Sequence, residues 1–151
     1  MKKMLKRKSK GFTLVELLIV VIIIGILAGM MMLSTGSATA KAEATKIVSD
    51  MRNMKAAAVM VYADTTTWPT AIASLDEYID QKIDATKYDI VESGDYIEFD
   101  ISTISDKAVK DSLAKLASSG VALYNTAQTA AITSSDLYTS DSATGVFMPV
   151  K

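Results

Sequence analysis

Apolar positions form an unbroken run near the start of the chain. From residue 12 to residue 33 every residue is apolar or glycine, apart from Thr13 and Glu16. At about 1.5 Å per residue, a helix over this run would be roughly 33 Å long, close to the roughly 30 Å hydrocarbon core of a bilayer. The run therefore predicts a membrane-spanning helix that contains one ionisable side chain, Glu16.

A second pattern, with helical periodicity, follows the apolar run. Residues 38–63 contain neither proline nor glycine, and their apolar positions recur at alternating steps of four and three. Such steps place side chains on one face of an α-helix. We therefore expect the helix to continue as a soluble amphipathic half over residues 34–63, with a loose joint at 34–37. Its expected buried face consists of Ala40, Ala44, Ile47, Met51, Met54, Ala58 and Val61.

The rest of the chain, residues 64–151, predicts a small globular head. Pro69 favours an extended Trp68, which we expect to act as a hydrophobic plug over the end of the helix. The predicted elements are a short helix to about residue 79 with a capping box at 74–77, a hairpin over 88–101 that turns at 93–94, a helix over 105–118 ended by Gly120, strands at 121–124 and 146–150, and a weaker strand pattern near 130–133. Pro149 would confine the strand at 146–150 to a sheet edge. Since neither a helix nor a sheet buries its apolar face alone, the expected fold class is α+β, with the long helix packed on a small antiparallel sheet.

Charge is distributed unevenly along the chain. Six of the 16 basic residues precede Gly11, whereas all 17 acidic residues follow it. Basic residues tend to remain on the cytoplasmic side of a membrane helix, so we expect a cytoplasmic N-terminus and an acidic domain outside. An acidic domain is poorly suited to general binding of a nucleic-acid backbone, and no nucleic acid is expected as a partner.

The composition also excludes several kinds of site. The chain has no cysteine and no histidine. Ser-His-Asp and Cys-His catalysis, histidine-based zinc sites and disulfides are therefore excluded. Asp95, Glu98 and Asp100 could be interpreted as paired catalytic carboxylates, but a solvated sheet face explains them better. No catalytic residue is predicted, and we expect a protein that is not an enzyme.

The N-terminal segment closely resembles the prepilin N-terminus of type IV pilins and type II secretion pseudopilins. The matching residues are the basic leader ending at Gly11, the sequence Phe12-Thr-Leu-Val-Glu16, and the apolar run to Ala28. The resemblance implies that a membrane peptidase cuts between Gly11 and Phe12 and methylates the new N-terminus at Phe12. It also implies a leader at 1–11, an assembly helix at 12–33, its soluble half at 34–63 and a head at 64–151.

Glu16 and two glycines are the candidate assembly residues. A carboxylate in an apolar segment needs a cationic partner, and the hypothesis is a salt bridge to the N-terminal amine of Phe12 on a neighbouring subunit. The alternative is an incidental charge near the membrane face. Gly25 and Gly29 form a G-x-x-x-G pattern that permits close helix packing in lipid, although glycine is also simply tolerated in membrane helices. Within the family they would mark a point where the helix unwinds on entering a filament.

Some family features are absent from this chain. Many relatives carry a C-terminal disulfide, which this chain lacks, and many have a proline near the position of Leu33, where this chain has none. Some major pseudopilins hold calcium in a C-terminal loop. Asp136 and Asp141 are weak calcium candidates by that resemblance, since the spacing of an EF-hand is absent and a solvated polar loop explains them better.

The expected function is that of a structural subunit of a type IV pilus or pilus-like filament. The resemblance implies a bacterial inner-membrane precursor that forms a helical homo-oligomer with related minor pilins. Its further expected partners are a prepilin peptidase, an inner-membrane assembly platform and the lipid bilayer. A pseudopilin of a type II secretion system is the alternative. In a different class, residues 1–40 would anchor or secrete an extracytoplasmic binding or enzymatic domain, with signal cleavage after Ala40 or none.

Overall fold

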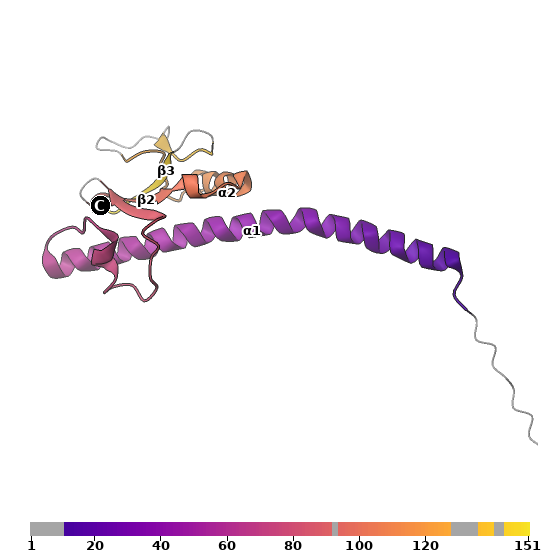
Figure 1. The fold of residues 1–151 in the computed structure, drawn as a ribbon. Coiled ribbons are helices and arrows are strands. Elements are labelled where there is room, and N and C mark those ends of the chain that lie inside the picture. The colour runs from indigo at the N-terminus through magenta and orange to yellow at the C-terminus, as the bar shows by residue number, and fades with distance from the viewer. Residues whose placement is uncertain (1–10, 92–93, 128–135, 141–143) are drawn as a thin grey trace, which may run out of the picture. The chain divides into compact units, whose positions relative to one another are not determined.

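The computed structural model describes residues 11–91, 94–127, 136–140 and 144–151. The chain divides into two units, one ending at Gly36 and the other running from Ser37 to Lys151. One helix, α1 (Leu14–Thr65), contributes to both units (Figure 1). The helix is continuous through residues 34–37, as expected, and the boundary between the two units falls within this stretch, where a loose joint was predicted. No proline or left-handed residue occurs at these positions to end it.

The N-terminal part of α1 has an exposed apolar surface in the isolated chain. All of its large apolar side chains from Leu14 to Met32 are at least 47% exposed. The helix is long and apolar enough to cross a membrane, and none of its most apolar window is buried within the protein. This surface therefore needs lipid or other helices to cover it.

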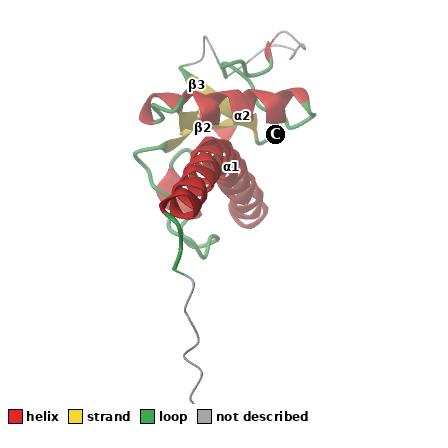
Figure 2. Cartoon of the chain, turned by 90° about the vertical axis from the view of Figure 1, so that its right-hand side faces the viewer, coloured by secondary structure: helices red, strands yellow, loops and turns green. Residues whose placement is uncertain are grey.

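The C-terminal half of α1 carries the core of the second unit. Met51 and Met54 are completely buried, and the predicted apolar face is confirmed at every position. Val48 and Ala57 extend this face beyond the prediction. Figures 1 and 2 show the sheet and α2 lying along this half of the helix. The buried side chains of the helix and the sheet form one hydrophobic cluster.

The sheet has three antiparallel strands in the order β1-β2-β3. The predicted hairpin is confirmed, because β1 (Tyr88–Val91) pairs with β2 (Tyr96–Asp100). The last predicted strand is also confirmed as β3 (Gly145–Pro149), which pairs with the other side of β2 and places Pro149 at an edge. An edge tolerates proline because one side of the strand needs no ladder hydrogen bond.

The predicted strand at 121–124 is wrong. Within the described residues it is reduced to single bridges from Tyr124 to Leu137 and Phe147. Leu123 is completely buried, so the segment fills the core without forming a ladder. The strand pattern near 130–133 lies outside the described residues.

The capping box predicted at 74–77 is also wrong. Ser74 lies inside a short 3-10 helix, η1 (Ile72–Leu75), which begins after Ala71 without any side-chain cap. Ile72 and Leu75 are both buried. A 3-10 helix has three residues per turn, so this spacing places both side chains toward the core in a single turn.

The second helix begins at a capping aspartate and ends at a glycine. A 3-10 turn, η3 (Ile101–Thr103), precedes α2 (Lys107–Ser118). The Asp106 side chain accepts a hydrogen bond of 2.8 Å from the Ala108 amide and caps the helix. Gly120 ends it with φ +104°, as predicted, and its amide donates to the Ala117 carbonyl. Val109, Leu113 and Ala117 are the buried side chains of α2.

Trp68 closes the end of the core. Its ring stacks on Tyr62 at a centroid distance of 4.4 Å, and it packs against the core as a half-buried plug. The Lys151 ammonium lies 5.2 Å from the Trp68 ring centroid and forms an ion pair with Asp95. The Val150 amide donates to the Asp95 carbonyl at 2.8 Å. Noncovalent contacts therefore fasten the C-terminal residues to the hairpin turn and to the loop after α1.

Replacing Lys151 with methionine is expected to lower the free energy of unfolding by about 1 kcal/mol, since a half-exposed ion pair and a cation–π contact contribute little each. Much of this loss should disappear at high salt, which screens the ion pair. Urea unfolding followed by Trp68 fluorescence measures the change. Lys41→Met is the control, because the exposed Lys41 forms no ion pair within the described residues. Equal stabilities of the two variants would contradict the role of Lys151.

Candidate functional site

The first turn of α1 is capped by two polar side chains from the apolar segment. The Glu16 Oε2 atom accepts hydrogen bonds from the Thr13 amide at 2.8 Å and from the Thr13 hydroxyl at 2.7 Å. The Glu16 amide in turn donates to the Thr13 hydroxyl oxygen at 3.2 Å. This reciprocal arrangement is a capping box, with Thr13 at the N-cap and Glu16 at the third helical position. It fixes where the long helix begins.

The cap leaves part of the Glu16 carboxylate available. Both hydrogen bonds from Thr13 reach Oε2, and within the described residues no hydrogen bond reaches Oε1. Glu16 is exposed in the isolated chain. The carboxylate can therefore keep its cap and still accept a cation through the second oxygen.

Gly11 and Phe12 lie immediately before this cap. Neither residue is helical, and the Phe12 side chain is 86% exposed. A non-helical, accessible peptide bond is the form that a processing enzyme needs. Phe12 and Glu16 are separated by only three residues, so the bond between Gly11 and Phe12 adjoins the capped turn.

Gly25 and Gly29 lie within the exposed apolar part of α1. A Cβ atom built on either residue would meet nothing within 4 Å beyond the adjacent backbone of its own helix. Nothing within the described chain therefore requires glycine at either position. Their small size would matter only where another helix approaches this surface.

Only one of the two calcium candidates, Asp136, lies within the described residues. The Asp136 carbonyl accepts a hydrogen bond from the Asn125 amide at 3.0 Å, and Asp141 lies outside the described residues. Among the residues that the structure describes, no group of three or more acidic side chains could hold a metal ion. Calcium binding through Asp136 and Asp141 stays a prediction.

The carboxylates near β2 have individual structural roles. Asp95 pairs with Lys151, and Asp100 accepts a 2.8 Å hydrogen bond from the Ser102 amide and caps η3. Glu98 is half-buried, and burial followed by the charges of Asp89 and Asp100 raises its pKa. A fully solvated face was therefore too simple an expectation for these side chains.

Thr13 is the residue of the candidate site that sequence reasoning missed. The signal was present, because threonine followed three residues later by glutamate, before an apolar run, is the capping-box pattern. The apolar context directed attention to the charge of Glu16 alone. The structure adds that this glutamate also has a partner within its own chain.

Residues 6–32 match the family model of the prokaryotic N-terminal methylation motif. The chain is similar to type II secretion system core protein G of Aeromonas hydrophila, with 33% identity over 95 residues that cover 63% of this chain and 66% of the relative. The same protein of Vibrio cholerae is 37% identical over 79 residues, which cover 52% and 53% of the two chains. Fimbrial protein EcpC of Eikenella corrodens is 38% identical over 66 residues, which cover 44% of this chain and 43% of the relative. The matches thus span less than two thirds of each relative's length.

A solved structure has a similar fold. The major type IV pilin PilA1 from Clostridium difficile superposes with a TM-score of 0.55 and 17% sequence identity. The superposition covers 76% of this chain and 98% of the pilin chain. At this identity the likeness concerns the fold alone, and it matches a long N-terminal helix joined to a small antiparallel sheet.

Proposed function

We infer that the chain belongs to the family of type IV pilins and type II secretion pseudopilins, and from that premise we propose that it is a structural subunit of a type IV pilus or pilus-like filament. One observation carries the proposal. A continuous helix joins an exposed apolar segment to a packed head, and the apolar segment begins at a capped turn next to the candidate processing bond. Lipid covers this segment in the precursor, and neighbouring helices cover it in the filament.

Processing between Gly11 and Phe12 supplies the cation that Glu16 lacks. A new amine at Phe12 carries positive charge, and the second carboxylate oxygen of Glu16 in a neighbouring copy can accept it. Both charges would then lie among apolar helices. Because an unpaired buried charge is strongly unfavourable, this pairing fixes the register of each incoming subunit. Gly25 and Gly29 permit close approach of the packed helices.

The proposed partners follow from this route. A prepilin peptidase processes the precursor in the inner membrane, with the N-terminus in the cytoplasm and the head outside. An inner-membrane platform then adds the subunit to a helical homo-oligomer that includes related minor pilins.

A pseudopilin of a type II secretion system is the second candidate. The observation in its favour is that several relatives are named type II secretion system core protein G. Both candidates use the same processing and the same helix packing, so they differ in the output of the filament. Loss of protein export in a deletion strain would favour the pseudopilin, whereas loss of surface fibres alone would favour the pilus.

Mass spectrometry of the N-terminus, on protein made in a strain with active prepilin processing, tests the proposal. We expect the mature chain to begin at methylated Phe12. Substituting Gly11 with a bulky residue should leave the leader attached, because the peptidase would no longer accept the bond. A chain that begins at Lys41 would instead identify a secreted domain, and an intact leader on the unsubstituted protein would contradict the filament proposal.

A further inference from the structure

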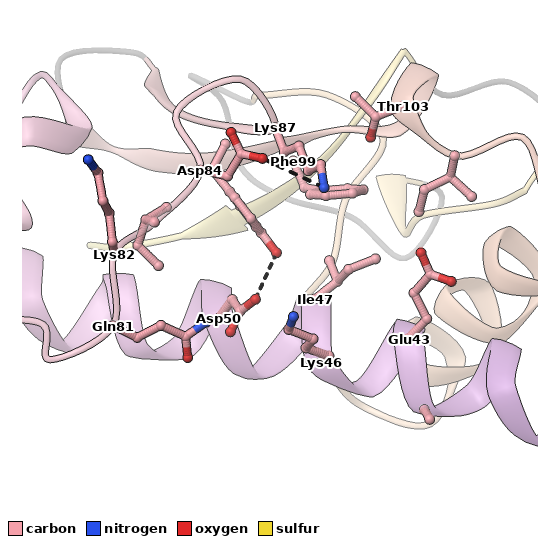
Figure 3. Close-up of a pocket in the computed structure, with 14 residues that line it drawn as sticks. Glu43, Lys46, Ile47, Asp50, Gln81, Lys82, Asp84, Lys87, Phe99 and Thr103 are labelled. Atoms are coloured by element: carbon pink, nitrogen blue, oxygen red, sulfur yellow. Dashed lines mark hydrogen bonds and ion pairs between the residues drawn. The ribbon is translucent and has the colours of Figure 1, made fainter.

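An open cleft of about 610 Å³ lies within the unit Ser37–Lys151 (Figure 3). One wall is α1, and the other walls are residues 81–84, the start of β1, Phe99 of β2, and residues 103–104. Its volume lies within the range of roughly 300–1,000 Å³ that is typical of small-molecule sites. The cleft is separate from the N-terminal processing and assembly residues described above.

A buried carboxylate with one free oxygen lines this cleft. Asp50 of α1 is only 9% exposed, and its Oδ2 atom accepts a 3.2 Å hydrogen bond from the Tyr88 hydroxyl (Figure 3). Burial, followed by the charge of Asp50, raises the pKa of the Tyr88 phenol, so Tyr88 remains a hydrogen-bond donor. Within the described residues, no hydrogen bond or ion pair reaches Asp50 Oδ1. This oxygen is not among the fully buried side-chain atoms, so it is open to the cleft and can accept a cationic ligand there.

The surroundings of Asp50 are apolar. The Phe99 ring lies 5.1 Å from the Tyr88 ring, centroid to centroid, and three isoleucines complete the apolar lining. These isoleucines are Ile47, Ile83 and Ile104, all of them buried. A ligand that reaches Asp50 would therefore place an apolar stem against these side chains.

The remaining charges of the cleft lie at its exposed rim. Lys87 and Asp84 neutralise one another across 3.6 Å. Glu43, Lys46 and Lys82 are not buried, so water and salt screen their charges, whereas the buried charge of Asp50 is screened much less. Among the described charged residues that line the cleft, Asp50 alone is buried, and its charge favours a cation over an anion at that point.

We propose that this cleft binds an organic ammonium group carried on an apolar stem. The ammonium donates to Asp50 Oδ1, and the stem packs against Phe99 and the isoleucines. Two sources offer this chemistry, namely a free alkylamine and a lysine side chain of a second copy of the chain. Binding of a free amine does not require a filament. The cleft can therefore fail to bind an amine in a protein that forms filaments, and it can bind an amine in a protein that forms none.

Titration of the full chain in detergent micelles with n-pentylamine, followed by NMR, tests the site. Saturable shifts are expected at the amides of Asp50, Ile83 and Phe99, and none with n-pentanol, which has the same stem without the charge. Asp50→Asn keeps an acceptor for Tyr88 and should weaken binding about tenfold or more, as expected for the loss of a charged partner. Glu77→Gln, which removes an exposed acid outside the cleft, should bind as the original protein does. Absence of saturable shifts, or equal affinity in Asp50→Asn, overturns the proposal.

A second variant keeps the test valid if Asp50→Asn does not fold. The chain has no cysteine, so Gln81→Cys introduces a single thiol at the rim of the cleft. The unmodified variant should bind n-pentylamine, and the same protein carrying a bulky maleimide over the mouth should not. Unchanged binding after modification overturns the site.

The same thiol distinguishes the two sources of the ammonium group. If a lysine of a neighbouring copy fills the cleft, the thiol of the Gln81→Cys variant should react with maleimide in the monomer and be protected in filaments. If a free amine is the ligand, this thiol should react equally in both forms. Either result supports the site, provided that the monomer binds n-pentylamine.

Discussion

Replacing Glu16 with glutamine is expected to abolish filament assembly while leaving the start of α1 intact. Glutamine at the third helical position can still accept from the Thr13 amide, so the capping box is kept and only the charge is lost. The neighbouring Phe12 amine would then be buried without a counter-charge. Removing one partner of such a buried pair typically costs about 3–5 kcal/mol, enough to reverse the addition of a subunit.

Electron microscopy of filaments and N-terminal mass spectrometry of the same preparation measure the result. The variant should be processed and methylated at Phe12 but remain in the membrane. Glu43→Gln is the matched control, because it removes an exposed acid from the soluble half of the same helix. Normal filaments from Glu16→Gln would show that the charge of Glu16 has no role in assembly.

Replacing Gly94 with alanine is expected to lower the free energy of unfolding by about 2–5 kcal/mol, the sum of backbone strain and overpacking. Gly94 adopts φ +88°, a left-handed conformation that disfavours side chains. A Cβ atom there would lie 2.7 Å from the Pro69 carbonyl oxygen and 2.8 Å from the Trp68 Cβ atom. The backbone of the loop would have to move, which would also disturb the stacking of Trp68 on Tyr62.

Gly120→Ala separates the two causes of this loss. Gly120 also has a positive φ, of +104°, but a Cβ atom there would meet nothing within 4 Å. This variant should therefore lose only the strain component, about 1–2 kcal/mol. Urea unfolding in micelles can be followed through Trp68, the one tryptophan of the chain. If the two variants lose equal stability, the close approach of Gly94 to the loop is not a significant packing contact.

Sequence reasoning succeeded where the signal is local. The apolar face from Ala40 to Val61 was predicted at every position, because helical periodicity depends only on neighbours three or four residues away. The hairpin of β1 and β2 was predicted for a similar reason, since its strands alternate and a short turn joins them. The end of α2 at Gly120 followed from the conformational freedom of glycine.

Sequence reasoning failed where distant contacts decide between two local patterns. Ser74 and Glu77 fit a capping box, but the buried Ile72 and Leu75 select a 3-10 turn instead. Residues 121–124 have the composition of a strand, yet only Tyr124 makes bridges, and its partners lie far along the chain. Propensity is a weak prior that tertiary packing overrides in such segments.

The sequence alone therefore determined the N-terminal motif, the long helix, its apolar faces and the α+β class. Each of these depends on the type and spacing of neighbouring residues. Tertiary structure alone decided the contact of Asp50 with Tyr88, 38 residues away, and the contact of Lys55 with the Pro149 carbonyl, 94 residues away. No local pattern encodes such pairs, because they arise only when the helix and the sheet bury their apolar faces against one another.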